Sequence, residues 1–242
     1  MASDYRAKVL SCKPLNEDVY HVRLEAPENK SFEYSAGQYL FIKMAEDDTR
    51  PYSIASPAGD GSTLEMHIRD IPGNDFCTQV LERLKTQSHI DVMLPEGACT
   101  LARASGERPL LFIAGGTGFA PFNAMIQQAL AENFSKAIEL YWGAKTEEDL
   151  YLLNEVRSWS ASQFNFNPVV QEPSSDWQGM TGFVHEAAFA NNDDLTAYDI
   201  FIGGSSAMVF NVYRQLRARQ VPGTQIFSDM LDILRDTGEL TD

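Results

Sequence analysis

The chain has 242 residues, of which 44% are hydrophobic and 22% are charged, and its formal net charge is −15. This length suits two compact domains, and no apolar run reaches the ~20 residues that cross a bilayer. The negative charge argues against nucleic acid and anionic membranes as partners, because both need a positive surface. We therefore expect a soluble two-domain protein.

The first residues contain no apolar core of signal-peptide length, which predicts a cytoplasmic protein. Three cysteines, Cys12, Cys77 and Cys99, lie far apart in the sequence and form no CxxC motif. This spacing predicts reduced thiols and argues against an iron–sulfur cluster, which needs clustered thiolates. We expect no metal site.

From Asp4 to about Pro95, apolar and polar residues alternate in short runs between Gly, Pro, Asn and Asp. This period predicts an antiparallel sheet that closes on itself. An amphipathic segment, residues 75–85, interrupts it and carries Phe76, Val80, Leu81 and Leu84 on one helical face. Residues 1–104 are therefore predicted to form a Greek-key β-barrel capped by a helix.

After residues 105–109 the pattern changes to apolar strands that alternate with helical segments. That rhythm is typical of a parallel sheet covered on both faces. Residues 108–242 are therefore predicted to form a doubly wound α/β domain. The run at 224–230 could add an edge strand, and the acidic tail at 232–242 is expected to form a terminal helix or a frayed end.

A glycine-rich loop, LLFIAGGTGFAPF, joins the first strand of this second domain to its first helix and contains Gly115, Gly116, Thr117 and Gly118. A helix N-terminus at the carboxyl end of a parallel strand offers free N–H groups to a phosphate. Glycines let a pyrophosphate approach the backbone, and Pro121 suits the first helical turn. The loop predicts a nucleotide site, although a plain tight turn is the alternative.

A second glycine loop, DIFIGGSSAM, ends the fourth strand at Gly203 and Gly204 and continues to Met208. In a doubly wound sheet this loop would lie beside the first one, so a nicotinamide could lie between them. The third glycine of the Rossmann fingerprint is absent, because Pro121 stands where that spacing would continue.

The two loops and the motif RPYSIAS, residues 50–56, occur together in an order that resembles the ferredoxin–NADP reductase superfamily. Within it, the chain is similar to the small bacterial NAD(P)H:flavin oxidoreductases, including those that supply reduced flavin to luciferase. The segments IELYWGAKTEEDLY, GMTGFV and IFSD extend the resemblance over nearly the whole chain.

The resemblance implies a flavin-binding barrel and a pyridine-nucleotide domain, with the flavin ring between them. Arg50 would face a flavin phosphate or the ribityl chain, Tyr52 would lie against the isoalloxazine, and Ser53 would hydrogen-bond near flavin N5 as the catalytic residue. A hydroxyl satisfied within the strand is the alternative for Ser53. Pro51 indicates an edge or bulged strand, because it donates no ladder hydrogen bond.

Five further residues are candidates for contact with the flavin: His67, Ile68, Arg69, Phe227 and Asp229. Three of them have an ordinary structural alternative. His67 could be a plain strand residue, Arg69 could pair with Asp70 or Glu65, and Phe227 could belong to the core.

Two departures from the family pattern bear on the cofactors. Gly73 and Cys77 stand where FAD-binding relatives hold the pyrophosphate, but a hydroxyl is usual in place of Cys77, so a grip on FAD would be weakened. After the second strand of the α/β domain, Lys145 is followed by the carboxylates of residues 147–149, whereas NADPH would need cations for its 2′-phosphate. NADH is therefore favoured.

We expect an NAD(P)H:flavin oxidoreductase that transfers hydride from NADH or NADPH to flavin N5. The flavin would be FMN, FAD or riboflavin, used as a substrate or held loosely, and the reduced flavin would serve an acceptor such as a flavin-dependent oxygenase or luciferase. The alternative is an FAD-bound reductase that feeds a separate iron–sulfur protein or oxygenase. A non-catalytic subunit is a third interpretation, which the intact Arg50, Ser53 and glycine loops disfavour.

Overall fold

The computed structural model describes residues 2–238 and residue 240. The chain divides into two compact units, one of residues 1–100 with 120–129 and the other of residues 101–119 with 130–242. The first ten residues of helix α2 (Ala120–Ala131) are thus grouped with the N-terminal unit, which the sequence does not predict. Within the described part of the chain, no helix is both long and apolar enough to span a bilayer.

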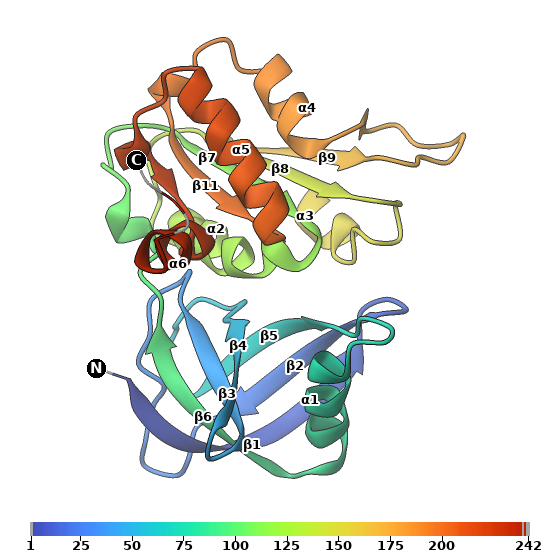
Figure 1. The fold of residues 1–242 in the computed structure, drawn as a ribbon, viewed down its shortest axis with the longest axis vertical. Coiled ribbons are helices and arrows are strands. Elements are labelled where there is room, and N and C mark those ends of the chain that lie inside the picture. The colour runs from blue at the N-terminus through green and yellow to red at the C-terminus, as the bar shows by residue number, and fades with distance from the viewer. Residues whose placement is uncertain (1, 239, 241–242) are drawn as a thin grey trace. The chain divides into compact units, whose positions relative to one another are not determined.

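The first unit is a six-stranded antiparallel sheet with the order β4-β3-β6-β1-β2-β5 (Figure 1). Its strands are β1 (Ser3–Pro14), β2 (Val19–Glu25), β3 (Tyr39–Ala45), β4 (Asp48–Ser53), β5 (Thr63–Arg69) and β6 (His89–Glu96). The two end strands approach each other just beyond β4, where the Ala55 N–H donates to the Glu65 carbonyl at 2.7 Å. The predicted closure of the sheet is confirmed.

Pro51 lies on end strand β4, opposite Phe41 of β3. The irregularity in this pair falls between Lys43 and Ala45, away from the proline. Of the two positions predicted for Pro51, the edge strand is therefore the observed one, and the missing N–H removes no bond from the interior of the sheet.

Helix α1 (Asp75–Thr86) contributes Val80, Leu81 and Leu84 to the core of the barrel. The prediction that Phe76 shares this buried face is wrong, since its side chain is 43% exposed. Phe76 lies in the first turn, and its ring lies over the Arg50 guanidinium at 4.6 Å instead of over the core.

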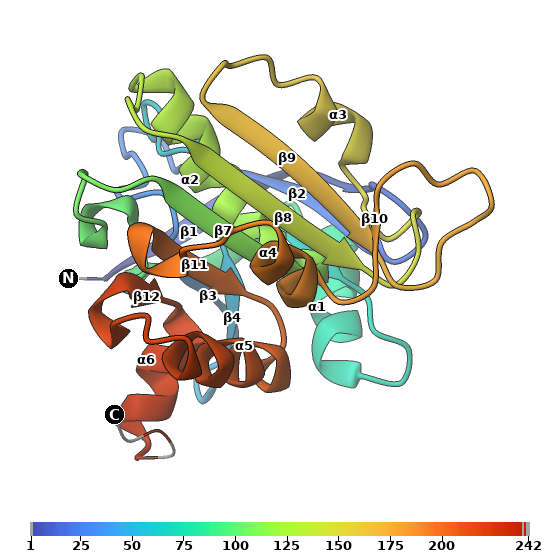
Figure 2. The same ribbon diagram turned by 90° about the horizontal axis from the view of Figure 1, so that it is seen from above.

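The second unit contains a parallel sheet with the order β10-β9-β8-β7-β11-β12 (Figure 2). Its strands are β7 (Leu110–Gly115), β8 (Ile138–Ala144), β9 (Phe164–Val170), β10 (Met180–Thr181), β11 (Asp199–Gly203) and β12 (Ile226–Phe227). The predicted edge strand is β12. The strand order runs outward in both directions from the β7–β11 pair, which is the doubly wound arrangement predicted from the sequence.

Three helices pack on one face of this sheet, namely α4 (Val184–Ala190), α5 (Ser206–Ala218) and α6 (Asp229–Asp236). The fourth, α3 (Leu153–Arg157), contacts β9. Helix α6 covers the start of the acidic tail, while residues 239, 241 and 242 of that tail lie outside the described part of the chain.

Candidate functional site

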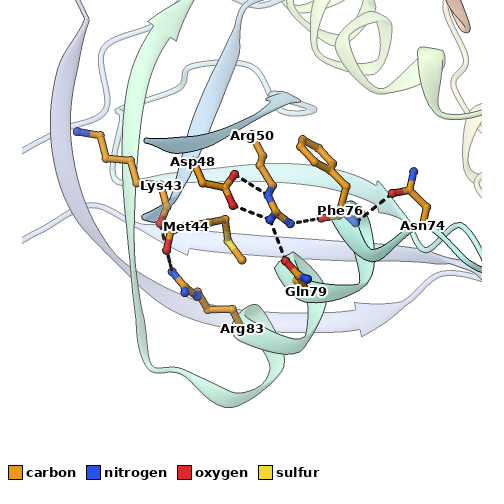
Figure 3. Close-up of polar contacts among 8 residues, drawn as sticks. All are labelled: Lys43, Met44, Asp48, Arg50, Asn74, Phe76, Gln79 and Arg83. Atoms are coloured by element: carbon orange, nitrogen blue, oxygen red, sulfur yellow. Dashed lines mark hydrogen bonds and ion pairs between the residues drawn. The ribbon is translucent and has the colours of Figure 1, made fainter. Parts of the chain in front are cut away.

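Arg50 is buried at 6% exposure and is held by groups of the first unit. Its Nε donates to Asp48 Oδ1 at 2.9 Å, and one terminal nitrogen donates to Asp48 Oδ2 at 2.6 Å. The same nitrogen donates to Gln79 Oε1 at 2.9 Å, and the other donates to the Phe76 carbonyl (Figure 3). Arg50 therefore connects β4 to α1 through hydrogen bonds. The sequence predicts Arg50 as a flavin ligand and does not predict this structural role.

A second arginine strengthens the same attachment of α1. Arg83 donates to the Met44 carbonyl at 2.9 Å and to the Lys43 carbonyl at 3.3 Å (Figure 3). These carbonyls lie at the end of β3, beside the turn that leads to β4. The structure around Arg50 is thus braced from two sides, so the guanidinium is held in a fixed position.

Tyr52 and Ser53 complete strand β4. The Tyr52 ring packs against the core of the barrel, and burial together with the neighbouring Cys77 raises the pKa of its hydroxyl. Tyr52 is thus a neutral aromatic at working pH. Ser53 is half-buried opposite Tyr39, and its hydroxyl makes no hydrogen bond to any other described residue. The structural alternative for Ser53 therefore finds no support, and its hydroxyl is available to a ligand.

Ser56, the last residue of the motif, is used by the fold instead. Its Oγ accepts the Glu65 N–H at 3.1 Å and lies 3.0 Å from the Tyr34 hydroxyl. Tyr34 also donates to the Pro57 carbonyl at 2.9 Å. The two serines of one motif thus differ in role, and only Ser53 has an unengaged hydroxyl.

Several backbone donors in the first turn of α1 are bonded within that turn. Asn74 caps it, since its Oδ1 accepts the Phe76 N–H at 3.0 Å and its carbonyl accepts the Cys77 N–H at 3.2 Å. The Thr78 hydroxyl donates to Asp70 Oδ1 at 2.8 Å, and Asp75 adds a negative charge to this turn. A pyrophosphate would meet occupied donors and a carboxylate here, so the residues do not fit a firm grip on FAD.

His67 is buried at 7% exposure on β5, on the opposite strand face from Met66 and Ile68, which enter the barrel core. Its ring lies edge-on to His21 with centroids 5.9 Å apart, and His21 Nε2 lies 3.0 Å from Glu65. Burial, assisted by His21, lowers the pKa of His67 to about 3. The imidazole is neutral at working pH.

We predict that His67 makes the protein sensitive to mild acid. The unfolded chain protonates a histidine below its usual pKa of 6.5, whereas the folded pKa is about 3. The stability contribution is complete above pH 6.5 and is lost as pH falls, by about 1.4 kcal/mol per pH unit. Urea unfolding should therefore show about 2 kcal/mol less stability at pH 5 than at pH 6.5.

His67→Gln should flatten this slope, whereas His89→Gln, which changes an exposed histidine, should keep it. Some slope should remain in both variants, because burial also lowers the pKa of His185. Identical slopes in the wild type and His67→Gln would show that His67 is not the cause.

Two neighbours of His67 on β5 have structural partners. The Ile68 side chain is 1% exposed within the barrel core, so only its backbone remains for a flavin contact. Arg69 Nε donates to Asp18 Oδ2 at 2.6 Å, so neither Asp70 nor Glu65, the predicted partners, is the acceptor found. The reason is the β2–β5 register, which places Val19 opposite Arg69 and so brings Asp18 beside it.

Phe227 and Asp229 belong to the second unit. The Phe227 ring is 4% exposed, lies 5.0 Å from the Phe201 ring and has the Arg103 guanidinium 5.4 Å above it. These contacts favour the core alternative for its side chain. Asp229 begins α6 at intermediate exposure.

The first glycine loop follows β7 as predicted. Gly116–Phe119 form the 3-10 helix η2, which leads into α2, and Pro121 lies in the first turn of that helix. Gly116 has a φ of 53°, a conformation in which a side chain is strained. Thr117 lies within η2 between Gly116 and Gly118.

The second loop lies against the first, which confirms the predicted adjacency. Gly203 of β11 stands in register with Ala114 of β7. A Cβ on Gly118 would come within 2.3 Å of the Gly204 nitrogen, and one on Gly115 would come within 2.5 Å of Met208 Sδ. Gly118 is thus required by the approach of the two loops, because its neighbours are backbone atoms, whereas Gly115 leaves room for the Met208 side chain. The role predicted for these glycines, close approach of a pyrophosphate, is a separate one.

Trp142, for which the sequence favours core packing over adenine stacking, also bonds to the glycine loop. Its indole N–H donates to the Gly116 carbonyl at 2.9 Å, and its ring stacks on Phe119 with centroids 4.1 Å apart. The side chain is fully buried. A tryptophan on a buried strand is ordinarily a packing residue, so only the structure reveals this bond.

We predict that Trp142→Phe raises the KM for NADH several-fold with a smaller change in kcat. The variant keeps an aromatic ring but leaves the Gly116 carbonyl without its donor, which costs about 1–3 kcal/mol and loosens the loop. Steady-state kinetics and thermal unfolding measure the two effects. Trp159→Phe, at a half-buried tryptophan packed on Phe164, is the control and should leave KM unchanged. An unchanged KM in Trp142→Phe would contradict the role.

The segment after β8 carries the residues predicted to select the nucleotide. Lys145 Nζ lies 3.5 Å from Glu172, and both side chains are largely exposed. Glu147 accepts the Ser174 N–H at 3.0 Å, and Asp149 accepts the Thr146 N–H at 3.1 Å. Lys145 thus has one exposed carboxylate partner, and the carboxylates of Glu147 and Asp149 are engaged with backbone and hydroxyl groups. Among the described residues, no group of three or more His, Cys, Asp or Glu side chains could hold a metal ion.

The sequence profiles of two domain families match the chain. The oxidoreductase FAD-binding domain matches residues 6–101, and the oxidoreductase NAD-binding domain matches residues 112–213. The first range contains the β4 motif, and the second contains both glycine loops.

Individual proteins with known names are similar to this chain over most of its length. The NAD(P)H-flavin reductase of Vibrio harveyi is 36% identical over 232 residues, which cover 93% of this chain and 97% of that protein. The CDP-6-deoxy-L-threo-D-glycero-4-hexulose-3-dehydrase reductase of Yersinia pestis is 30% identical, with 93% of this chain and 68% of that protein covered. Among solved structures, the ferredoxin reductase in carbazole 1,9a-dioxygenase superposes with a TM-score of 0.83 at 26% identity, covering 94% of this chain and 69% of that one.

Proposed function

The chain belongs to the NAD(P)H-flavin reductase family, and we propose that it oxidises NADH or NADPH with a flavin that it binds and then releases in reduced form. Residues 1–104 would serve as the flavin domain and residues 108–242 as the nucleotide domain. The flavin, when bound, accepts the hydride at N5. The protein orients the two reactants and places a small polar group beside the receiving atom.

We assign that polar group to Ser53. Of the two serine hydroxyls in the RPYSIAS motif, it is the one that the fold does not use, since Ser56 is engaged with Tyr34 and Glu65. A hydroxyl can either donate or accept as N5 changes protonation. Tyr52 and the backbone of Ile68 would border the ring. In the nucleotide domain, the two adjoining glycine loops would bind the pyridine nucleotide. Trp142 would position the first of these loops through its hydrogen bond to the Gly116 carbonyl.

The observation that best supports release of the flavin is the set of contacts in the first turn of α1. Asn74 accepts from the Phe76 and Cys77 N–H groups, the Thr78 hydroxyl donates to Asp70, and Asp75 places a carboxylate at the start of the helix. A retained FAD would need such a turn to hold its pyrophosphate. The alternative, an FAD-bound reductase serving a separate acceptor, is supported by the FAD-binding domain match and by the similarity to the Yersinia pestis reductase and to the carbazole dioxygenase ferredoxin reductase. It ranks second because the flavin reductase of Vibrio harveyi is more similar in sequence and in length.

The preferred nucleotide, the cellular location and the downstream acceptor are also proposals. We propose NADH over NADPH, because the single lysine after β8, Lys145, is followed in sequence by the carboxylates of residues 147–149, which would repel a 2′-phosphate. The exposed contact of Lys145 with Glu172 adds little to this preference. We propose a cytoplasmic location, and a flavin-dependent oxygenase or luciferase as the consumer of the reduced flavin. The net charge of −15 supports neither nucleic acid nor an anionic membrane as a partner.

One preparation tests these statements together. The purified protein should leave gel filtration nearly colourless, and it should oxidise NADH only when riboflavin, FMN or FAD is added. NADH should give the higher kcat/KM than NADPH. Stoichiometric FAD that survives gel filtration would support the FAD-bound alternative, and no NADH oxidation with any flavin would overturn the proposed activity.

A further inference from the structure

The pairing of Asp48 with Arg50 bears on which flavin the chain accepts. An arginine has five N–H donors, and the four bonds described above use the guanidinium on three sides (Figure 3). Asp48 takes the fork made by Nε and one terminal nitrogen. That fork is the part of an arginine that fits a carboxylate or a phosphate in two parallel bonds.

A phosphate could use this fork only by displacing Asp48. The Asp48 side chain is 40% exposed, whereas that of Arg50 is 7% exposed, so the carboxylate stands on the solvent side of the pair. Hydrogen bonds from Arg50 hold the pKa of Asp48 below its usual range, so the carboxylate is charged at working pH. An incoming phosphate therefore meets a negative group in front of the buried cation.

The surrounding charges do not compensate. The charge of Lys43 is matched, since its Nζ lies 2.6 Å from Asp4, whereas Arg83 keeps its positive charge because the Lys43 and Met44 carbonyls that it contacts are neutral. Asp47 and Asp75 are negative residues of the adjoining turn and of the first turn of α1. The charge of Arg50 is matched by Asp48, and the single charge of Arg83 is outnumbered by Asp47 and Asp75, so these groups together give a phosphate dianion no net attraction.

We propose that Asp48 is a specificity residue that withholds Arg50 from the 5′-phosphate of a flavin. This inference rests on the proposed flavin reduction and names its substrate class. The chain recognises the isoalloxazine and ribityl portion, which riboflavin and FMN share. It therefore binds riboflavin at least as tightly as FMN, although the family resemblance would assign Arg50 to the phosphate.

The test compares binding, using quenching of the intrinsic fluorescence of riboflavin and FMN by the protein. These two flavins differ only in the phosphate, so the ratio of Kd for FMN to Kd for riboflavin isolates its contribution. In the wild type the ratio should be one or more and should rise as salt is lowered, because repulsion is less screened. Asp48→Asn should lower the ratio about tenfold, the gain of roughly one charge-assisted bond.

Asp47→Asn is the matched control, since it removes the same charge from an exposed neighbour that does not hold Arg50. Its ratio should stay within about twofold of the wild type, because an exposed charge acts weakly. If Asp48→Asn folds poorly, Asp48→Ala and the salt dependence of the wild type decide the question. FMN binding that is tenfold tighter than riboflavin binding in the wild type and strengthens at low salt would overturn the proposal.

The two proposals fail in different ways. An equal ratio in the wild type, Asp48→Asn and Asp47→Asn, with riboflavin-dependent NADH oxidation intact, would overturn only the role of Asp48. Absence of NADH oxidation with every flavin would instead overturn the proposed function.

Discussion

Ser53→Ala should lower kcat for flavin-dependent NADH oxidation about 10²-fold, the scale seen when one preorganised polar group is removed from a reacting atom. The KM for NADH should change by less than about threefold, because the nucleotide loops belong to a different unit of the chain. The variant should fold normally, since the Ser53 hydroxyl bonds to no other described residue. Steady-state kinetics at saturating riboflavin, with riboflavin quenching as a binding check, measure these effects.

Ser56→Ala is the matched control, because it removes a hydroxyl from the same motif. It should lower the free energy of unfolding by about 1–3 kcal/mol, since it leaves the Glu65 N–H without its acceptor. Its kcat should stay close to that of the wild type below the unfolding temperature. If Ser53→Ala keeps full turnover, or if both variants lose turnover equally, Ser53 has no special role in the reaction.

The architecture could be predicted because it depends on patterns that are local in sequence. Alternation of period two between Asp4 and Pro95 predicts the closed antiparallel sheet, and apolar strands alternating with helices predict the parallel one. The meeting of the two glycine loops also follows, since β7 and β11 are neighbours at the point where the strand order reverses. Grouping of residues 120–129 with the barrel depends on contacts between distant segments, which no local pattern contains.

The site was predicted less completely, because side-chain partners depend on register and on distant elements. The partner of Arg50 had a usable signal, since Asp48 and Arg50 stand two apart on one strand and share a face. Gln79 and the Phe76 carbonyl had none, because they reach Arg50 only when α1 docks. The bond from Trp142 to Gly116 likewise needs β8 to lie beside β7 in its observed register.

Gly118→Ala should lower kcat/KM for NADH by about 10²-fold or more, the cost expected when binding groups move by about 1 Å. A Cβ at this position would lie 2.3 Å from the Gly203 carbonyl carbon and from the Gly204 nitrogen. Both atoms belong to backbone, which cannot rotate aside, so the two loops must separate. Such overpacking should also cost about 1–3 kcal/mol of stability.

Two measurements on this variant distinguish an effect on flavin binding from an effect on nucleotide binding. Riboflavin quenching should change much less than the NADH kinetics, because the β4 motif lies in the first unit and is linked to the loop indirectly, through α2, whose Asn123 donates to the Ala55 carbonyl at 2.8 Å. Gly223→Ala is the control, since its nearest neighbour to an added Cβ is the flexible Arg217 end at 3.7 Å. Normal NADH kinetics in Gly118→Ala would mean that the nucleotide does not depend on the joined loops. A loss confined to NADH would show that their close approach, which only a glycine at 118 permits, is what holds the nucleotide site together.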